Sequence, residues 1–376
     1  MNLRDNPFEC DDVAASGFWT DQSEALSLLR RKLAGRRPLV IVSPRRCGMG
    51  GLVRQAVAQT GQRAIFVNVL MALSAAMLAE LLLKAFLAVE PWERIRGALM
   101  KLRTKPVLTF NPENGGMEVA FGSAAKGSDA LEVVLGLIAQ ASEKENHLIV
   151  VLDQFQAAAD LEPGTEKRLR ALMAREESIS CVLLVSEESR AATLFENPQS
   201  PFFHFGTLLR FEPIADEGFS AFLTARLEVI RGKKAAEDAR KILALTKCHP
   251  FCTQQLAALF WNLCLLRGAD ASVEAALEEC LRSRSPGYAY LWTRLGRTAR
   301  RILLALARGA KLQNLRDCPT STVYSAAARL QKEGFMVRGE SFEFEDPFFG
   351  LWLRRALQQA AVGRPGAKEA GVARPL

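Results

Sequence analysis

Short apolar runs rich in β-branched residues recur along the first 213 residues, and helical patterns separate them. Strands that are apolar along their whole length and alternate with helices are typical of a parallel sheet covered on both faces. Because parallel crossovers are right-handed, the pattern predicts a doubly wound α/β sandwich. The runs are PLVIVS (38–43), AIFVNV (64–69), HLIVVLDQF (147–155), SCVLLVS (180–186) and TLLRFEP (207–213).

The segments between these runs carry the helical part of the pattern. Apolar residues recur there at helical spacing, so each segment is expected to cover the sheet with its apolar face. Residues 90–125 are expected to be irregular, with a small hairpin in LTFNPENGGMEVAF (108–121) because apolar residues alternate on both arms. The expected helices span about 22–34, 52–59, 73–89, 130–144 and 165–175.

The rest of the chain changes character after residue 213. Residues 214–283 show helical patterns only, and residues 292–357 read as three helices followed by two short strands, MVRG and SFEFED. That order is typical of a winged helix. The predicted domains are an α/β domain (1–213), a helical lid (214–285), a winged helix (290–360) and a disordered tail (361–376), whose composition is rich in Gly, Pro and Ala.

Composition limits the kind of protein. Apolar residues make up 49% and charged residues 24%, as in ordinary globular chains. No apolar run reaches the ~20 residues of a membrane helix, and the polar start has no secretion signal, so we expect a cytoplasmic protein that does not enter a membrane. No two of the eight cysteines have the two-residue spacing of a zinc or redox motif, and no two of the three histidines lie at helical spacing from each other. A Cys/His metal cluster is therefore not expected.

Positive charge is concentrated near the end of the chain. Residues 281–376 hold 17 Lys and Arg against 7 Asp and Glu, whereas the whole chain has a net charge of +8. A basic module of this kind favours nucleic acid or another acidic partner. A solvated basic face is the alternative that composition leaves open.

A strand, a tight loop and a helix follow one another in IVSPRRCGMGGLV (41–53), which is the setting of a phosphate-binding P-loop. Such a loop needs glycines at both ends, a Lys for the β- and γ-phosphates and a Ser/Thr hydroxyl for Mg²⁺. Ser43 stands at the first glycine position and Gly48 at the second. Met49 stands at the lysine position and Gly50 at the hydroxyl position.

Met49 and Gly50 therefore offer neither the ammonium for phosphate nor the hydroxyl for Mg²⁺. Charge-assisted bonds to phosphate are the strong ones, so much of the affinity for ATP or ADP is expected to be missing. Gly48, Gly50 and Gly51 mark the turn. Arg45 and Arg46 lie in the crown of the loop rather than at the first turn of the helix, so they are expected to compensate little.

The run HLIVVLDQF ends in an acid, as a Walker B strand does. Asp153 would hold Mg²⁺ through water, and the next residue is normally a Glu that activates the attacking water. Gln154 stands there instead, and an amide cannot accept the proton. Ligands in open α/β sheets bind beyond the carboxyl ends of the strands, so the loops after Ser43, Leu152 and Val185 are expected to surround one cleft.

Several segments, in order over nearly all of residues 6–355, resemble the archaeal-type P-loop ATPases, which are related to AAA+ and STAND ATPases. The resemblance implies an ATP- or ADP-binding domain with Mg²⁺, a helical lid and a winged helix. It also implies that Ser186 is the sensor residue and that His249 and Pro250 lie against the nucleotide base. The matching segments are NPF (6–8), GFWTDQSEALSLL (17–29), SPRRCGMGGL (43–52), LDQFQ (152–156), VSEESRAATLFENPQSPFFHFG (185–206), KCHPFCTQQLAALFW (247–261) and FEDPFFGLWLRR (344–355).

A winged helix raises the question of DNA. The reading helix would span about 321–333 and would offer Ser321, Thr322, Arg329 and Lys332, which suit phosphates better than base edges. A packing or protein-contact module is the alternative.

These observations support three hypotheses about function. The first is a pseudo-ATPase that binds nucleotide weakly or not at all and acts as a scaffold or regulator through a protein partner or its own oligomer. The second is an ATP-binding switch that positions the winged helix. The third is a DNA-binding regulator. In none of them is hydrolysis of ATP expected.

Overall fold

The computed structural model describes residues 6–8, 23–43, 48–100, 106–111, 116–121, 127–142, 147–176, 178–186, 188–211, 216–310, 312, 319–338 and 341–362. The chain divides into two compact units. We call residues 10–214 the N-terminal unit, and residues 1–9 together with 215–376 the C-terminal unit.

A five-stranded parallel sheet forms the centre of the N-terminal unit. Its strands lie in the order β2-β5-β6-β1-β7, so successive strands are joined by crossovers. Each strand falls within one of the five apolar runs, which confirms the predicted α/β fold class. The strands are β1 (Leu39–Val42), β2 (Ala64–Asn68), β5 (Ile149–Asp153), β6 (Ser180–Val185) and β7 (Thr207–Arg210).

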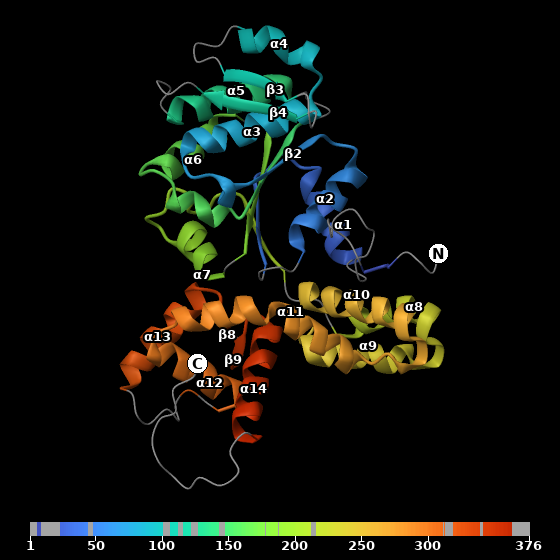
Figure 1. Cartoon of the computed structure of the whole chain (residues 1–376). Coiled ribbons are helices and arrows are strands. Elements are labelled where there is room, and N and C mark those ends of the chain that lie inside the picture. Colours follow the sequence, from blue (N-terminus) through green and yellow to red (C-terminus); the bar gives the residue numbers. More distant parts are fainter. Residues whose placement is uncertain are drawn as a thin grey trace. The chain divides into compact units, whose positions relative to one another are not determined.

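Helices cover both faces of this sheet (Figure 1). Alternate residues of a strand serve opposite faces: in β1, Leu39 and Ile41 pack with the core under α1 and α2, whereas Val40 and Val42 pack with the core under α3, α5 and α6. This two-sided burial explains why the strands are apolar throughout. The helices are α1 (Ser23–Leu33), α2 (Met49–Thr60), α3 (Ala75–Val89), α5 (Gly127–Ala141) and α6 (Thr165–Arg175).

The segment 90–125 corrects one expectation. It contains the helix α4 (Trp92–Met100), where irregular chain is predicted. The hairpin strands β3 (Pro106–Asn111) and β4 (Gly116–Phe121) follow this helix. The helix is short and buries Ile95 and Leu99, one turn apart, which is too little for a clear helical period. Shorter turns are η1 (Val69–Met71), η2 (Phe155–Asp160), α7 (Glu188–Ala191) and η3 (Ala192–Glu196).

The C-terminal unit begins with helices and ends with a winged helix. Its helices are α8 (Asp216–Arg231), α9 (Ala235–Thr246), α10 (Pro250–Arg267), α11 (Val273–Arg294), α12 (Arg297–Ala307), α13 (Thr320–Lys332) and α14 (Pro347–Val362), with the short turns η4 (Gly232–Lys234) and η5 (Gly268–Asp270). Antiparallel β8 (Met336–Arg338) and β9 (Phe342–Phe344) form the wing between α13 and α14.

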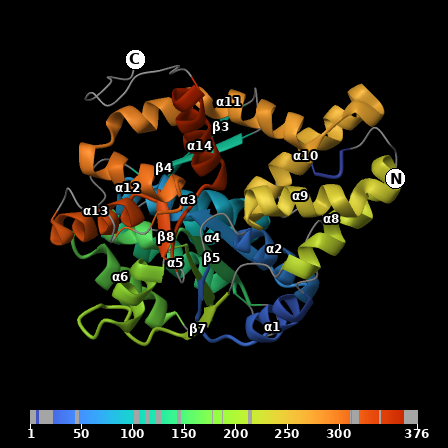
Figure 2. The ribbon, with the colours of Figure 1, turned by 90° about the horizontal axis from the view of Figure 1, so that it is seen from below.

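The long helix α11 links the helical group to the winged-helix elements (Figure 2). It runs unbroken from Val273 to Arg294, so the predicted boundaries at 285 and 290 both fall inside one helix. Pro286 lies within it and removes one backbone hydrogen bond, yet α10 and α14 pack alongside and the helix continues. Likewise α14 extends to Val362, so the first two residues of the predicted tail are helical, and residues 363–376 lie outside the described chain.

The beginning of the chain belongs to the C-terminal unit, whereas the predicted α/β domain (1–213) includes it. The Asn6 amide donates to the Ala258 carbonyl at 3.0 Å and to Asn262 Oδ1 at 2.9 Å, both on α10. Phe8 is buried, and its ring meets that of Trp261 edge to face with centroids 6.1 Å apart. The first described residues thus cover one side of α10.

Asp346 ties the winged helix to the helical group within the C-terminal unit. Its carboxylate accepts hydrogen bonds from the Tyr288 hydroxyl and the Phe348 amide, both at 2.9 Å, and the Cys252 thiol donates at 3.7 Å. These partners come from α11, α14 and α10. Burial, helped by Asp346, raises the pKa of Tyr288 well above its usual range, so the hydroxyl stays protonated and donates.

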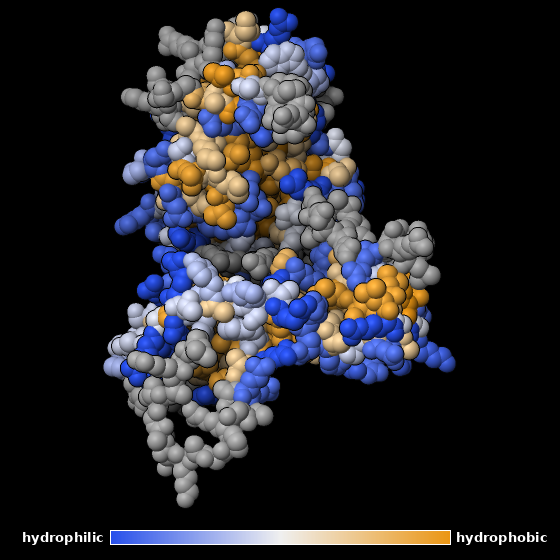
Figure 3. Space-filling model, viewed as in Figure 1, coloured by the Kyte–Doolittle hydropathy of each residue, from blue (hydrophilic) through white to orange (hydrophobic). Residues whose placement is uncertain are grey.

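The surface of the C-terminal unit carries an apolar area over α8 and α10, visible in Figure 3. It includes Leu265 and Leu266 at the end of α10 and Val229 on α8, of which Leu266 is 83% exposed. Along the described chain, no helix combines the length and apolarity needed to cross a bilayer. The five cysteines that the structure describes are free thiols.

Candidate functional site

A pocket of about 320 Å³ opens at the carboxyl edge of the sheet in the N-terminal unit. Strand register places it there, because Asn68 pairs with Asp153 and Val42 with Val185, so the ends of neighbouring strands lie level. The structure brings most of the predicted phosphate-loop and Walker B positions together at this pocket. The described lining residues are Ser43, Gly48, Met49, Gly50, Gly51, Arg54, Phe66, Val67, Asn68, Asp153, Gln154, Leu184 and Ser186.

The helix α2 points its first turn at the pocket. It begins at Met49, earlier than the predicted start at residue 52, because Gly48 adopts a left-handed conformation (φ 74°) that turns the chain into the helix. The Gly48 carbonyl then accepts from the amides of Gly51 and Leu52, at 3.0 and 3.2 Å. A helix start of this kind presents backbone N–H groups to an anion.

The backbone of this turn suits an anion, but its side chains lack the charged and hydroxyl groups of a P-loop. Met49, at the lysine position, is only 8% exposed and packs into the core beneath α1 and α2. Gly50, at the hydroxyl position, has no side chain, and a Cβ there would lie 3.6 Å from Asp153 Oδ2. From Gly48 onward the described site thus keeps a helix start that suits an anion, without the ammonium and the hydroxyl that a P-loop carries at these two positions. Arg45 and Arg46 lie outside the described residues.

Asp153 is the acid of the pocket, at the end of β5. Burial raises the pKa of its carboxyl, while the Gln154 amide, which donates to Oδ1 at 2.8 Å, and the nearby charge of Arg54 both act to lower it. Since burial dominates, the folded protein favours the protonated form of Asp153 more than the unfolded chain does.

Gln154 bridges the ends of two strands. Its backbone is left-handed (φ 54°), a conformation that costs a residue other than glycine some free energy. Its side-chain Nε2 donates to the Ser186 hydroxyl and its Oε1 accepts from Gln156 Nε2, both at 2.8 Å. The amide is therefore held in place by Ser186, the predicted sensor residue.

The pocket is also lined by Arg54, a charged residue outside the predicted motifs. Arg54 lies one turn after Gly50 on α2, and its guanidinium carbon sits 4.1 Å from the centre of the Phe66 ring. The i, i+4 spacing from Gly50 is the signal that could have found it, because residues four apart share a helix face. Asn68 ends β2, and its Oδ1 accepts from the Leu70 amide at 3.0 Å.

The predicted base contacts, His249 and Pro250, lie in the C-terminal unit. His249 caps the start of α10, where its Nδ1 accepts from the Cys252 amide at 3.3 Å, and Pro250 is the first helical residue. Pro is a favoured residue at the first helical position, and the His249 ring supplies the capping acceptor, so both residues have a local role at this helix start.

The residues considered for DNA lie on α13. Ser321, Thr322 and Lys332 are exposed, whereas Arg329 donates to Glu333 Oε1 at 2.7 Å in an i, i+4 pair. The first three can therefore contact a phosphate without first breaking an ion pair seen in the structure.

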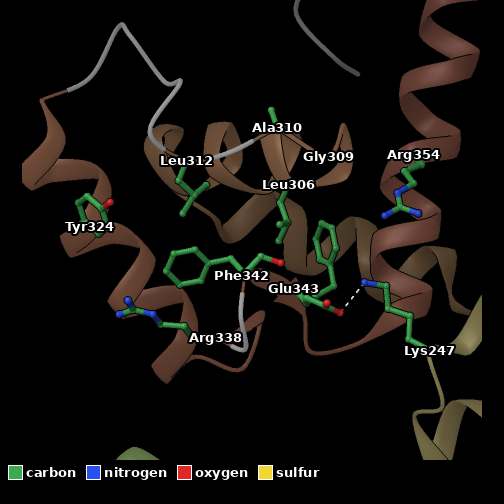
Figure 4. A pocket seen from close by; sticks show the side chains of 12 residues that line it. Lys247, Leu306, Gly309, Ala310, Leu312, Tyr324, Arg338, Phe342, Glu343 and Arg354 are labelled. Carbon is green, nitrogen blue, oxygen red and sulfur yellow. Dashed lines mark hydrogen bonds and ion pairs between the residues drawn. The ribbon is translucent and has the colours of Figure 1, made fainter. Parts of the chain in front are cut away.

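A second pocket of about 610 Å³ lies beside α13 in the C-terminal unit, between the wing, α12 and α14 (Figure 4). The guanidinium carbon of Arg338 lies 5.8 Å from the centre of the Phe342 ring, while Lys247 pairs with Glu343 at 2.6 Å. The Arg354 Nε donates to the Ala307 carbonyl at 3.0 Å. Cations outnumber acids among the described lining residues, which gives this pocket a basic character.

Known proteins resemble this chain in fold rather than in sequence. No protein-family model matches the chain, and no curated protein matches it by sequence. A Walker-type ATPase of Pyrococcus abyssi matches 93% of this chain and 99% of its own, with a TM-score of 0.67 at 18% identity. The chain has a P-loop ATPase fold.

Two further structures with the P-loop ATPase fold come from Aeropyrum pernix. The ORC2 protein, solved as ADPNP–ADP complexes, has a TM-score of 0.57 at 14% identity and covers 96% of this chain and 98% of its own. The ORC1 protein in complex with DNA has a TM-score of 0.50 at 13% identity, with coverage of 95% and 97%. The resemblance to archaeal-type P-loop ATPases is confirmed at the level of fold.

A P-loop ATPase fold raises the question of Mg²⁺, which prefers oxygen ligands in a strict octahedron. Here the helix position that would supply a hydroxyl is Gly50, and the amide oxygen of Asn68 already accepts from Leu70. Asp153 is the single carboxylate among the described lining residues. The residues present are a poor fit to the metal.

Proposed function

We propose that this protein binds a nucleotide without hydrolysing it and serves as a regulator or scaffold. The observation that carries the proposal is the environment of the phosphate loop. Met49, whose thioether is buried in the core, and Gly50 occupy the two positions at which a P-loop ATPase carries its phosphate-binding lysine and its Mg²⁺-binding hydroxyl. The N–H groups at the start of α2 still favour an anion.

Chemistry at Gln154 supports the absence of hydrolysis. A general base must accept a proton from water in the transition state, and an amide cannot do so at neutral pH. The side-chain amide of Gln154 also donates a hydrogen bond to Ser186 and accepts one from Gln156. Nucleotide in this pocket is therefore a ligand, as ADPNP and ADP are in the Aeropyrum pernix ORC2 complexes.

Two measurements on the purified full chain test the proposal. Isothermal titration with ATP and with ADP should give saturable binding, and no heat at millimolar nucleotide would refute binding. Phosphate release should stay at the level of a protein-free blank. Turnover well above the blank that disappears in Asp153→Asn would refute the non-hydrolysing assignment.

A partner is part of this proposal, because a protein that binds nucleotide without chemistry acts through what it contacts. Leu70, Met71 and Leu73 follow β2 and are 64%, 60% and 85% exposed. A run of exposed apolar side chains favours a protein contact, with a second copy or another chain. Light scattering across a concentration series tests self-association, and Leu73→Glu should reduce any oligomer that uses this run.

DNA binding through the winged helix is a second candidate, favoured by the exposed Lys332 on α13 and Arg338 on the wing. The ORC1 protein with the same fold is in complex with DNA. Binding to a labelled duplex should weaken steeply as salt rises, because phosphate contacts release counterions. The variant Lys332→Ala/Arg338→Ala should bind more weakly with a shallower salt slope, and no binding at low salt would dismiss this candidate.

A further inference from the structure

The side of α2 that faces Asp153 carries an unusual pair, Gly50 and Arg54. The two are four residues apart, so they lie on one face of the helix, and both line the pocket. Gly50 leaves the space next to the carboxylate open, since even a Cβ would reach within 3.6 Å of Asp153 Oδ2. A long side chain one turn further along can extend into that space.

Arg54 is that side chain. It is exposed, and its guanidinium rests over the ring of Phe66 with Cζ 4.1 Å from the centroid. A cation–π contact at an exposed site is weak enough to exchange for a stronger partner. The side chain can therefore leave the ring when an anion enters the pocket.

The described lining residues of the pocket carry two charged groups. Among the described lining residues Arg54 is the single cation and Asp153 the single acid. The residues fit Mg²⁺ poorly, as described above, because Gly50 lacks the hydroxyl and the Asn68 oxygen is engaged. A nucleotide's phosphates would therefore enter a site whose one described positive side chain is an arginine.

We propose that Arg54 takes the place of Mg²⁺, so that the pocket binds the polyphosphate of ADP or ATP as a metal-free anion. The guanidinium would lie between Asp153 and the terminal phosphate, where a P-loop ATPase places its metal. A planar guanidinium can bond two phosphate oxygens at once while it neutralises them. This inference rests on the proposed nucleotide binding and specifies how the phosphates are held.

Isothermal titration of the full chain with ADP and with ATP tests it, once with excess Mg²⁺ and once with EDTA at matched ionic strength. The dissociation constants should agree within about twofold between the two conditions. Arg54→Ala should weaken binding about tenfold or more, because it removes a charge-assisted bond to phosphate. The affinity of Arg54→Lys should lie between those of the unmodified protein and Arg54→Ala, because an ammonium keeps the charge but cannot bond two phosphate oxygens as a guanidinium does.

Arg30→Ala is the matched control, because it removes the same charge from an exposed position on α1 that does not line the pocket. Thermal unfolding of each variant checks that the fold is intact. Binding that requires Mg²⁺, or an Arg54→Ala affinity equal to that of the control, would overturn the role of Arg54 while leaving nucleotide binding in place. No binding by the unmodified protein in either condition would overturn both proposals.

Discussion

Restoring the two lost groups of the phosphate loop is the most informative perturbation of this protein. In Met49→Lys/Gly50→Thr, the lysine replaces a core side chain that is only 8% exposed. Full burial of a methionine contributes about 1.5–3 kcal/mol, and a lysine stem can retain part of that burial while its ammonium reaches the pocket. We therefore expect the variant to lose about 1–2 kcal/mol of stability.

The threonine is the less costly of the two changes. Its Cβ would lie 3.6 Å from Asp153 Oδ2, an ordinary contact distance, and its helix propensity is close to that of glycine or slightly better. The restored ammonium adds one charge-assisted bond to phosphate, worth about 1.5–3 kcal/mol. At 1.4 kcal/mol per tenfold, the affinity for ATP should rise by about 10- to 150-fold.

Titration calorimetry with Mg·ATP measures this gain, with Met49→Lys and Gly50→Thr as single-variant controls and thermal unfolding as the check on the fold. The restored hydroxyl should also make binding depend on Mg²⁺, because the metal regains a ligand beside Asp153. A folded double variant whose affinity equals that of the unmodified protein would refute the idea that these two positions limit binding.

Three further outcomes follow from the structure. Gly206→Ala should cost about 2–4 kcal/mol in denaturant unfolding, because φ is 73° and a Cβ would lie 2.3 Å from the Pro38 carbonyl oxygen; an unchanged midpoint would contradict the backbone geometry. Asp153→Asn should stabilise the protein at neutral pH. The folded pKa of Asp153 is raised, so wild-type stability is full below the unfolded pKa and falls as pH rises toward the folded pKa. Urea midpoints of the two proteins should therefore converge in acid and separate at pH 7, and a constant difference would argue against the linkage. Phe8→Ala should destabilise the C-terminal unit by about 2–4 kcal/mol through loss of the buried ring against Trp261, and equal melting temperatures would show that the contact adds no stability.

The sheet could be predicted from sequence because its strands are buried on both faces and read as uninterrupted apolar runs. The same property located the site, since Ser43, Asp153 and Ser186 directly follow or end three of those strands. The direction of a side chain is a different matter. Nothing in the motif shows that Met49 turns into the core or that Arg54 lines the pocket, because both facts depend on how α2 packs against the sheet.

Other features depend on long-range packing and left weak local signals. The helix α4 buries too few residues to show a period, and α11 continues through Pro286 because neighbouring helices support it. The place of Asn6 and Phe8 is the clearest case. Their partners on α10 lie about 250 positions away, with separations of 252 and 256 for the two Asn6 bonds. Local sequence patterns carry no information about such a pairing.

The contact of Asn6 and Phe8 with α10 has a consequence for how the protein folds. During synthesis Asn6 and Phe8 are made before the parallel sheet, whereas α10, which receives them, is made only after the last strand of that sheet. The C-terminal unit therefore depends on contacts between residues far apart in sequence, and contacts of this kind slow folding. Their entropic cost is modest, because the entropy of loop closure grows only slowly with loop length. The chain crosses between the units twice, so the N-terminal unit is one continuous segment, and excising it would leave the C-terminal unit in two separate pieces.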